Sequence, residues 1–436
     1  MAVCFAKHGY KVVGIDTDQH LLAKLREGQP PFHEPNLQGY LADGLKNKNF
    51  TVTDDPSMNS MSDIAFITVG TPSQANGQID LSYVVSASKM IGHSLRSARH
   101  YQLVVVKSTV APGTARNVVK PVIDRESNKA YNLDYSVCSN PEFLREGRAI
   151  YDSENPDRII IGSDDHAAIE RLEKFYQTLY SNTMPTVIRT TFENAELTKY
   201  ANNAFLATKV SFINCIASIA ERIPHTDVNS IASAIGLDAR IGPHFLNAGL
   251  GWGGSCLPKD LHSLLNLSEN LGYRAELIAA TDETNRQQAE KAVEFAKQAL
   301  GALADKRVAI LGLAFKPETD DMREAVSVRV INRMLGEGAS VSVSDPLAME
   351  NAKRIFGDRI TYAANVDECI EGADCCILVT EWPEFKKLNG EAFVRKMRTP
   401  TVVDGRRLYD PKEFKKAGVK LFAVGVGPEG SESENR

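Results

Sequence analysis

A single cysteine stands behind a cluster of glycines in the stretch GLGWGGSCLPKD, residues 249–260. Glycines let a backbone approach a ligand closely, and Pro258 ends any strand or helix that runs through Cys256. Lys259 and Asp260 add a cation and a carboxylate within a few residues of the sulfur. Because a thiolate near a cation has a lowered pKa and is the nucleophilic form, the stretch favours a reactive cysteine. A small structural thiol beside a flexible loop is the alternative.

A second group of candidates lies in ELTKYANNAFLATK, residues 196–209. Lys199 and Asn203 are four residues apart in a helical pattern and therefore share one face. A lysine on a long helix usually points into solvent, which is the simpler interpretation of Lys199. Asparagine, however, is a poor helix former, so Asn202 and Asn203 in the middle of a helix need a reason.

Short β-branched runs alternate with helical patterns in the first part of the chain, which predicts an open doubly wound sheet to about residue 190. The expected strands are residues 10–16, 63–70, 101–109 and 134–142. Ligands of such sheets bind beyond the carboxyl ends of the strands. The side chains that follow these strands are Asp16, Thr71, the run Lys107 to Thr109, Glu142, Arg145 and Glu146. Asp16 is placed to bond a ribose hydroxyl pair, or else to cap the next helix.

The sequence opens on MAVCFAKHG, a helical pattern of the kind that follows a glycine-rich phosphate loop. We therefore expect the first strand and the G-x-G-x-x-G loop of the N-terminal domain to be missing, through a truncation or a wrong start. That strand is central in the 3-2-1-4-5-6 order, so its neighbours should have unpaired inner edges. The alternative is a divergent domain that binds its cofactor weakly.

The chain is predicted to be α/β, with two Rossmann-like doubly wound domains joined by a long central helix. The predicted domains are residues 1–190, a helical segment at 191–298, a second α/β domain at 299–422 and a disordered tail at 423–436. The central segment opens with one unbroken helical pattern at 191–223, well above the average helix length of about 11–12 residues.

Bulk properties are those of a globular protein of two or three domains: 436 residues, 43% hydrophobic and 24% charged. A net charge of −5 gives no electrostatic reason to expect nucleic acid or an anionic membrane as partner. No apolar run approaches the ~20 residues that span a bilayer. Seven irregularly spaced cysteines without a Cys/His cluster indicate reduced thiols, a cytoplasmic protein and no metal site.

Seven stretches occurring in order carry a resemblance that covers about residues 1–422. They are VGTPSQANGQIDLSYV, VKSTVAPGT, SNPEFLREGRAIYDSENPDRIIIG, AELTKYANNAFLATKVSFIN, RIGPHFLNAGLGWGGSCLPKD, ILGLAFKPETDDMRE and VDGRRLYDP. With them the chain resembles the UDP-glucose/GDP-mannose dehydrogenase family of nucleotide-sugar 6-dehydrogenases.

The resemblance implies a four-electron oxidation of a sugar C6 alcohol to a carboxylate with two NAD⁺ in succession. Cys256 would form a thiohemiacetal with the C6 aldehyde and then a thioester that water hydrolyses. Lys199 and Asn203 would hold the oxygen that becomes negative. Asp260 would position or deprotonate a water, and Glu142 would act as acid and base in the hydrolysis.

The resemblance also implies binding residues. Cofactor contacts would be Asp16, Thr71, Thr109, Glu146, Lys259 and Arg323. Substrate contacts would be Glu142, Leu144, Arg145, Lys199, Asn203, Phe245, Leu246, Asn247, Ala248, Gly249, Gly253, Phe315, Lys316 and Arg406. Arg240 would reach the substrate of a neighbouring subunit, so a homo-oligomer, first of all a dimer, is expected. The chain departs from the family pattern at Leu21, often basic, and at Trp252, usually Phe or Tyr, which should pack over the sugar.

Three interpretations follow. The first is oxidation of UDP-glucose to UDP-glucuronate. The second is the same chemistry on GDP-mannose or, less consistent with GGSCLPKD, on a UDP-N-acetylhexosamine. The third is a nucleotide-sugar-binding protein that lost catalysis together with its phosphate loop.

Overall fold

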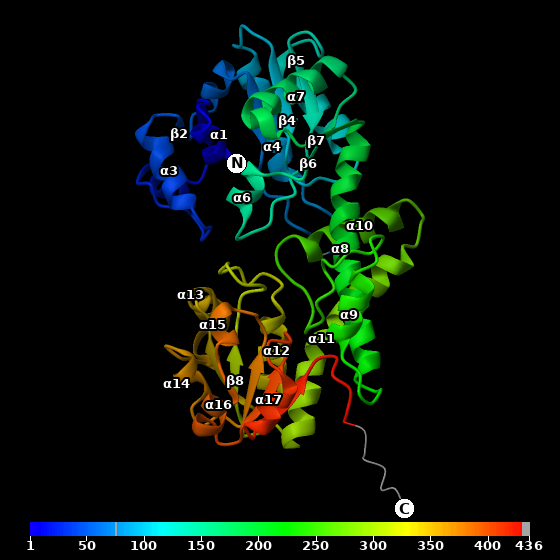
Figure 1. Cartoon of the computed structure of the whole chain (residues 1–436). Coiled ribbons are helices and arrows are strands. Elements are labelled where there is room, and N and C mark those ends of the chain that lie inside the picture. Colours follow the sequence, from blue (N-terminus) through cyan, green and yellow to red (C-terminus); the bar gives the residue numbers. More distant parts are fainter. Residues whose placement is uncertain (75, 430–436) are drawn as a thin grey trace, which may run out of the picture. The chain divides into compact units, whose positions relative to one another are not determined.

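A computed structural model describes residues 1–74 and 76–429 of the chain (Figure 1). The chain forms two compact units. Unit 1 comprises residues 1–202 and 262–272, and unit 2 comprises residues 203–261 and those from 273 onward. Two helices contain the boundaries, α8 (Phe192–Ala220) and α10 (Leu257–Asn270). The α/β class and the two Rossmann-like domains predicted from the sequence are confirmed.

The strands of unit 1 form two separate sheets. β1 (Val12–Ile15) pairs in parallel with β2 (Phe50–Thr53). The other sheet has the order β3-β4-β5-β6-β7, with strands Ile64–Ile67, Gln102–Val106, Tyr135–Ser139, Arg158–Gly162 and Thr186–Thr190. All its pairings are parallel except a one-residue antiparallel contact between β5 and β6. Within residues 1–74 and 76–429, no ladder joins β1 to β3, so each keeps one edge without a strand.

The helices of unit 1 connect these strands and bury their apolar faces on them. β4 and β5 are buried at every position, as expected for β-branched strands covered on both faces. Asp18 and Asp165 start α2 and α7 by accepting hydrogen bonds from the first free backbone N–H groups. The helices are α1 (Ala2–Lys7), α2 (Gln19–Arg26), α3 (Leu37–Lys46), α4 (Ser82–Leu95), α5 (Lys120–Ser127), α6 (Ala149–Glu154) and α7 (His166–Tyr180), with short turns η1 (Pro56–Met61), η2 (Ala115–Val119) and η3 (Ser181–Thr183).

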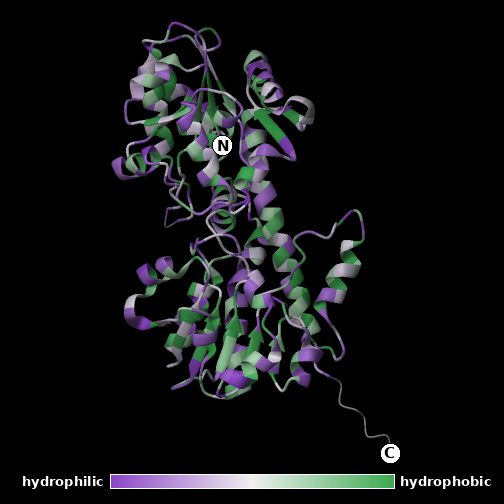
Figure 2. Ribbon diagram, turned by 60° about the vertical axis from the view of Figure 1, so that its left-hand side comes forward, coloured by the Kyte–Doolittle hydropathy of each residue, from purple (hydrophilic) through white to green (hydrophobic). Residues whose placement is uncertain are grey.

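Unit 2 is built on one parallel sheet of order β10-β9-β8-β11-β12-β13, with helices on both sides of it (Figure 1). The order reverses beside β8, which is the switch point at which ligands of such sheets bind. Its strands are β8 (Arg307–Leu311), β9 (Ser340–Ser344), β10 (Thr361–Tyr362), β11 (Cys375–Leu378), β12 (Thr401–Asp404) and β13 (Lys420–Ala423). The central strands are hydrophobic along their length (Figure 2).

The helices of unit 2 include the second half of α8 and the start of α10. The others are α9 (Val228–Gly236), α11 (Glu276–Leu300), α12 (Val326–Gly336), α13 (Met349–Phe356), α14 (Val366–Ile370), α15 (Pro383–Lys386), α16 (Gly390–Lys396) and α17 (Pro411–Lys416), with a short turn η4 (Gly357–Arg359). The sequence predicts a tail from residue 423, whereas β13 extends to Ala423 and Val426 pairs with Asp227. Residues 430–436 of that tail lie outside the described residues.

Helix α8 is the one helix, within the described part of the chain, that is long and apolar enough to cross a membrane by length and composition. Its interior positions nevertheless include the buried polar residues Glu196, Lys199, Asn203 and Asn214. Glu196 and Lys199 have partners in unit 1, and Asn203 and Asn214 have partners in unit 2. Each of these side chains has at least one hydrogen-bond partner, which is typical of a helix in the core of a globular protein.

Candidate active site

Cys256 occupies the residue immediately before helix α10 in unit 2. Its carbonyl accepts the first helical hydrogen bond from the Asp260 N–H at 2.9 Å. Its side chain is exposed, and the Ser255 hydroxyl lies 3.5 Å from the sulfur. The N-terminus of a helix stabilises a neighbouring negative charge, which favours the thiolate form of a cysteine at this place. The position is therefore suited to a nucleophile.

The other cysteines contrast with Cys256. Cys4, Cys138, Cys369, Cys375 and Cys376 are buried, and only Cys215 is exposed like Cys256. Burial raises the pKa of the Cys138 and Cys375 thiols to about 12 and that of Cys369 to about 11. Buried neutral thiols are unreactive, so these are core residues.

Close backbone packing within unit 2 explains the glycines before Cys256. A Cβ on Gly253 would lie 2.1 Å from the Glu324 carbonyl oxygen. Gly254 has φ +89°, and its N–H donates to the Arg323 carbonyl at 3.0 Å. Because no side chain fits between these segments, the loop is fixed against residues 323–325. The glycines therefore allow the close approach of another backbone segment of unit 2.

Trp252 also belongs to the packing of this loop. Its indole N–H donates to the Ser211 hydroxyl on α8 at 3.0 Å, and its backbone exchanges two hydrogen bonds with the Asn285 side chain on α11. The residue is buried. Trp252 therefore anchors the loop to two helices of unit 2.

Three polar side chains form a hydrogen-bonded cluster one helical turn after Cys256. The Asp260 carboxylate is buried and accepts from the Asn203 amide at 2.6 Å and from the Lys259 ammonium at 2.6 Å. The structure thus brings together three predicted site residues of unit 2. Asn203 comes from α8 and the other two from α10.

A second cluster lies in unit 1, around the turn that follows β5. The buried ammonium of Lys199 on α8 donates to the Glu142 carboxylate at 3.0 Å and lies 5.4 Å from the centre of the Phe143 ring. The other Glu142 oxygen accepts from the Leu144 N–H at 2.5 Å. The pairing joins a strand-end loop to the central helix across 57 positions of sequence. Lys199 therefore has a specific carboxylate partner and is not a solvent-facing lysine.

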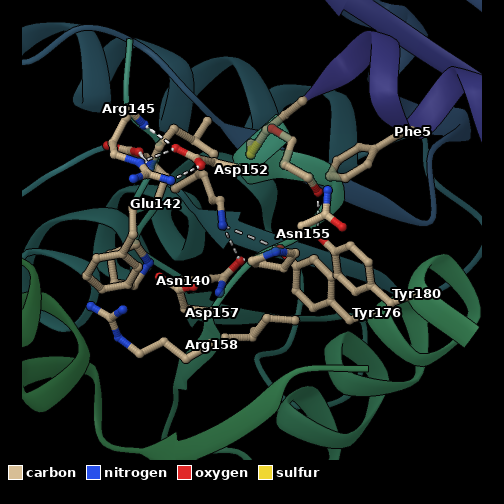
Figure 3. Close-up of a pocket in the computed structure, with 18 residues that line it drawn as sticks. Phe5, Asn140, Glu142, Arg145, Asp152, Asn155, Asp157, Arg158, Tyr176 and Tyr180 are labelled. Carbon is tan, nitrogen blue, oxygen red and sulfur yellow. Dashed lines mark hydrogen bonds and ion pairs between the residues drawn. The ribbon is translucent and has the colours of Figure 1, made fainter. Parts of the chain in front are cut away.

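Glu142 also lines a cavity of about 70 Å³ in unit 1 (Figure 3). Such a volume holds a few water molecules. The polar groups around it include Lys107, Asn140, Arg158 and Asp157. Arg145 lies at its edge, where its guanidinium forms two hydrogen bonds with Asp152, at 2.6 and 3.0 Å (Figure 3).

The predicted cofactor residues of unit 1 lie at the carboxyl ends of strands. Asp16 directly follows β1 and is exposed. Thr71 follows β3, and its hydroxyl donates to the Thr109 carbonyl after β4 at 2.8 Å. A carboxylate and hydroxyl groups at these strand ends suit a ribose and a phosphate, so the residues present fit a dinucleotide. No group of three or more His, Cys, Asp or Glu that could hold a metal ion occurs among the residues described.

Three family models match consecutive parts of the chain. They describe the UDP-glucose/GDP-mannose dehydrogenase family: its NAD binding domain at residues 1–180, its central domain at 193–287 and its UDP binding domain at 309–411. The chain belongs to this family.

Individual relatives agree with this membership. The chain is 40% identical over 423 residues to the UDP-glucose 6-dehydrogenase TuaD of Bacillus subtilis (strain 168), covering 97% of this chain and 89% of the relative. It is 40% identical to a UDP-glucose 6-dehydrogenase of Rhizobium meliloti (strain 1021), covering 97% and 96%. A solved UDP-glucose dehydrogenase from Pyrobaculum islandicum has a TM-score of 0.89 at 37% identity, covering 98% of this chain and 94% of its own.

The remaining residues that the family resemblance implies are distributed over both units. In the run from Phe245 to Gly249, Phe245 and Asn247 are exposed while Leu246, Ala248 and Gly249 are buried, so only alternate side chains face outward. Phe245 has a left-handed backbone, φ +63°. Arg240 is exposed and paired with Asp238 at 2.6 Å.

Three further predicted contacts lie in unit 2, and each has a partner within that unit. Arg406 follows β12 and donates to the Gly251 carbonyl at 2.9 Å, so it ties the sheet to the loop. Arg323 is paired with Asp321 at 2.6 Å. Lys316 lies over the Phe315 ring, 5.7 Å from its centre, beyond the end of β8. In unit 1, Glu146 is half-buried in the turn after Arg145.

Lys107 and Glu196 are among the buried charged residues of unit 1 for which the sequence predicted no role in the site. Lys107, which follows β4, is 9% exposed, and Glu196 on α8 is 2% exposed. Glu196 accepts from the Gly113 N–H at 2.6 Å and the Ala115 N–H at 2.9 Å. The available signal was position, because Lys107 stands at a strand end and Glu196 one turn before Lys199.

Proposed function

We propose that the chain catalyses the NAD-dependent oxidation of UDP-glucose to UDP-glucuronate. The balance is one C6 alcohol, one water and two NAD⁺ giving one carboxylate, two NADH and three protons. The family membership and the UDP-glucose 6-dehydrogenases among the relatives support the substrate. The observation that carries the chemistry is the exposed Cys256 at the start of α10, on a loop that close packing holds in place.

Cys256 acts as the nucleophile on the C6 aldehyde. Its sulfur bonds to the carbonyl carbon to give a thiohemiacetal, and the loss of a hydride from that carbon leaves a thioester. Water then displaces the thiolate and releases the carboxylate. The start of α10 stabilises the thiolate both before attack and when it leaves.

The buried polar groups stabilise the negative charge that develops on the substrate oxygen, and they accept the proton of the attacking water. Lys199 and Asn203 donate to the substrate oxygen as it becomes negative. Glu142, held by Lys199 and by the Leu144 N–H, takes a proton from the attacking water. Asp260, held by Asn203 and Lys259, positions a water close to the same oxygen.

Bound NAD⁺ supplies the hydride acceptor in both oxidations. Asp16 is placed to bind a ribose hydroxyl pair, with Thr71, Thr109, Glu146, Lys259 and Arg323 as further contacts of the cofactor. Lys316 and Arg406 in unit 2 offer positive charge for the diphosphate of the nucleotide sugar. Phe315 offers an aromatic surface beside them.

We further propose that the protein is a cytoplasmic homo-oligomer, first of all a dimer. Phe205, Phe212 and Ile219 recur every seven residues on α8 and are 66%, 51% and 50% exposed. Large apolar side chains aligned on one helix face indicate an interface, because isolated ones would be scattered. The exposed Arg240 is available to a neighbouring subunit.

The test follows NADH with UDP-glucose, GDP-mannose and a UDP-N-acetylhexosamine. We expect two NADH for each UDP-glucose consumed and little from the other sugars. A preference for another nucleotide sugar would show that the proposed substrate is wrong and that the proposed type of reaction is right. One NADH per sugar with accumulating aldehyde would exclude the thioester route. Sugar binding without NADH from any substrate would favour the binding protein.

A further inference from the structure

Lys107 is a buried cation that the proposed reaction does not yet use. It follows β4, is 9% exposed and has no ion-pair partner within residues 1–74 and 76–429. Its ammonium donates to the Asn140 side-chain oxygen at 2.9 Å and lies 3.5 Å from the Tyr176 hydroxyl (Figure 3). The centre of the Tyr176 ring lies 5.9 Å away. A neutral amide and a phenol are therefore its immediate partners.

Such a lysine costs stability. Removing a cation from water without a carboxylate partner is unfavourable, so buried lysines are rare. Burial lowers the pKa of Lys107 to about 8, the nearby Glu142 opposes this shift, and Lys199 adds to it. An unfavourable buried charge in a cavity beside a reactive carboxylate indicates a functional role.

The contacts of Lys107 lead to Glu142 through Asn140. The Asn140 N–H donates to the Val106 carbonyl at 2.9 Å, and its amide donates to the Ile160 carbonyl at 2.6 Å. Its side-chain oxygen accepts from both Lys107 and Tyr176, the latter at 2.5 Å. Asn140 thus links three strands and α7, and the chain reaches Glu142 two residues later. Lys107 and Glu142 line the same cavity.

Three other cationic side chains, two that line the cavity and Lys199 bound to Glu142, have partners of their own. Arg145 is bound to Asp152, and Arg158 donates to Asn202 at 2.7 Å and lies over the Phe143 ring. The Lys199 ammonium is bound to Glu142. Lys107 therefore adds a second positive charge beside a carboxylate that already holds one lysine.

We propose that Lys107 is a positioning residue for Glu142: through Asn140 it fixes the turn from Asn140 to Glu142, so that the carboxylate is held where it accepts the proton of the hydrolytic water. This role rests on the proposed function. It assigns Lys107 to the last step, in which water adds to the thioester carbon, Glu142 takes its proton, and the Cys256 thiolate leaves.

The test compares Lys107→Met with wild type and with Lys174→Met, an exposed lysine of α7 two residues before Tyr176. Methionine fills similar volume without charge, and Asn140 still accepts from Tyr176. We expect Lys107→Met to lower kcat at least about tenfold, within the range for lost acid–base assistance, with little change in KM for UDP-glucose. A rapid first formation of two NADH per active site should remain, because only hydrolysis is slowed. Lys174→Met should behave as wild type.

Thermal unfolding without substrate separates this role from a structural one. Because Lys107→Met removes a buried unpaired charge, its Tm at pH 7 should equal or exceed that of wild type. A lower kcat with a lower Tm, a loss of the initial NADH, or a kcat within twofold of wild type would each overturn the proposal. If wild type forms no NADH with any sugar, the proposed function fails and this role fails with it. An active wild type with an equally active Lys107→Met rejects the role alone.

Discussion

Glu196 allows a direct test of how burial in the core of unit 1 changes the pKa of a carboxyl group. Its carboxyl is 2% exposed and accepts two backbone N–H bonds, from Gly113 and Ala115. Burial raises its pKa from 4.5 to about 7, although these two hydrogen bonds act in the opposite direction and Glu193 adds to the rise. The perturbation is Glu196→Gln, which keeps the shape and removes the titration.

The direction in which stability changes with pH follows from the raised pKa of Glu196. The folded chain holds this proton more tightly than the unfolded chain, so the stabilisation is fully present below pH 4.5 and is lost as the pH rises through about 7. A shift of this size corresponds to about 3 kcal/mol as an upper bound. The free energy of opening of wild type, relative to Glu196→Gln, should therefore fall by up to about 3 kcal/mol between pH 4.5 and pH 8.

The assay must report on unit 1. Both tryptophans, Trp252 and Trp382, lie in unit 2, so tryptophan fluorescence would monitor the wrong unit. Hydrogen exchange at the Gly113 and Ala115 amides reports the opening of this contact, after correction for the intrinsic exchange rate at each pH. The protection of wild type relative to Glu196→Gln should fall by up to about a hundredfold over this range.

Glu193→Gln is the matched control, since Glu193 lies one turn earlier on α8 and is paired with Arg116 at 2.6 Å. The Arg116 side chain lowers the pKa of Glu193, so its contribution is present above its unfolded pKa and is lost as the pH falls. A pH-independent difference between wild type and Glu196→Gln would refute the raised pKa. A difference of the opposite slope would show that the two N–H donors outweigh burial.

Three further changes test the other parts of the molecule. Cys256→Ser should stall at or before a slow ester, lowering steady NADH formation by about a hundredfold or more, whereas near-normal turnover would identify a structural thiol. Gly253→Ala should destabilise unit 2 by about 2–3 kcal/mol in urea unfolding followed by tryptophan fluorescence, since its Cβ meets the Glu324 carbonyl at 2.1 Å; an unchanged midpoint would contradict this packing. Phe212→Asp should halve the mass measured by light scattering if the exposed face of α8 forms the dimer, and an unchanged mass would place the interface elsewhere.

Hydrophobic periodicity predicted the local elements of this chain well. The pattern at 191–223 corresponds to α8 at Phe192–Ala220, and the four expected strands of the first domain correspond to β1, β3, β4 and β5. The sequence also predicts unpaired inner edges on two strands of the first domain, and β1 and β3 have such edges, because no ladder joins them among the described residues. β2 (Phe50–Thr53) was not among the expected strands.

Candidate site residues could be selected from the sequence by residue type, but their pairings could not be predicted. The sequence indicated Lys199 and Glu142, but their contact joins positions 57 residues apart. Arg145 was expected to face a substrate, and its guanidinium is bound to Asp152 seven residues later. A charge in a strand-end loop is equally compatible with a ligand and with a protein partner, so only the fold distinguishes them.

The glycines before Cys256 show that the sequence also leaves the partners of the backbone undetermined. A glycine permits close approach, whether of a ligand or of another segment. Gly253 and Gly254 are occupied by approach to Glu324 and Arg323 of the chain itself. The sequence could identify these positions as close contacts, but the partner is a property of the folded unit.

Asp260 has a structural role beside the catalytic role that we propose for it, and both affect how its variants must be interpreted. The carboxylate is buried, and Asn203 and Lys259 are its two partners at 2.6 Å. Removing either partner leaves a buried charge less well satisfied, which destabilises the junction of α8 and α10 in unit 2. Cys256 lies one turn earlier at the start of the same helix, so a displaced Asp260 also displaces the proposed nucleophile. A loss of activity in Asn203→Ala therefore indicates an oxygen-binding role only if the urea midpoint of unit 2 is unchanged; activity and stability that fall together would assign Asn203 to positioning Asp260.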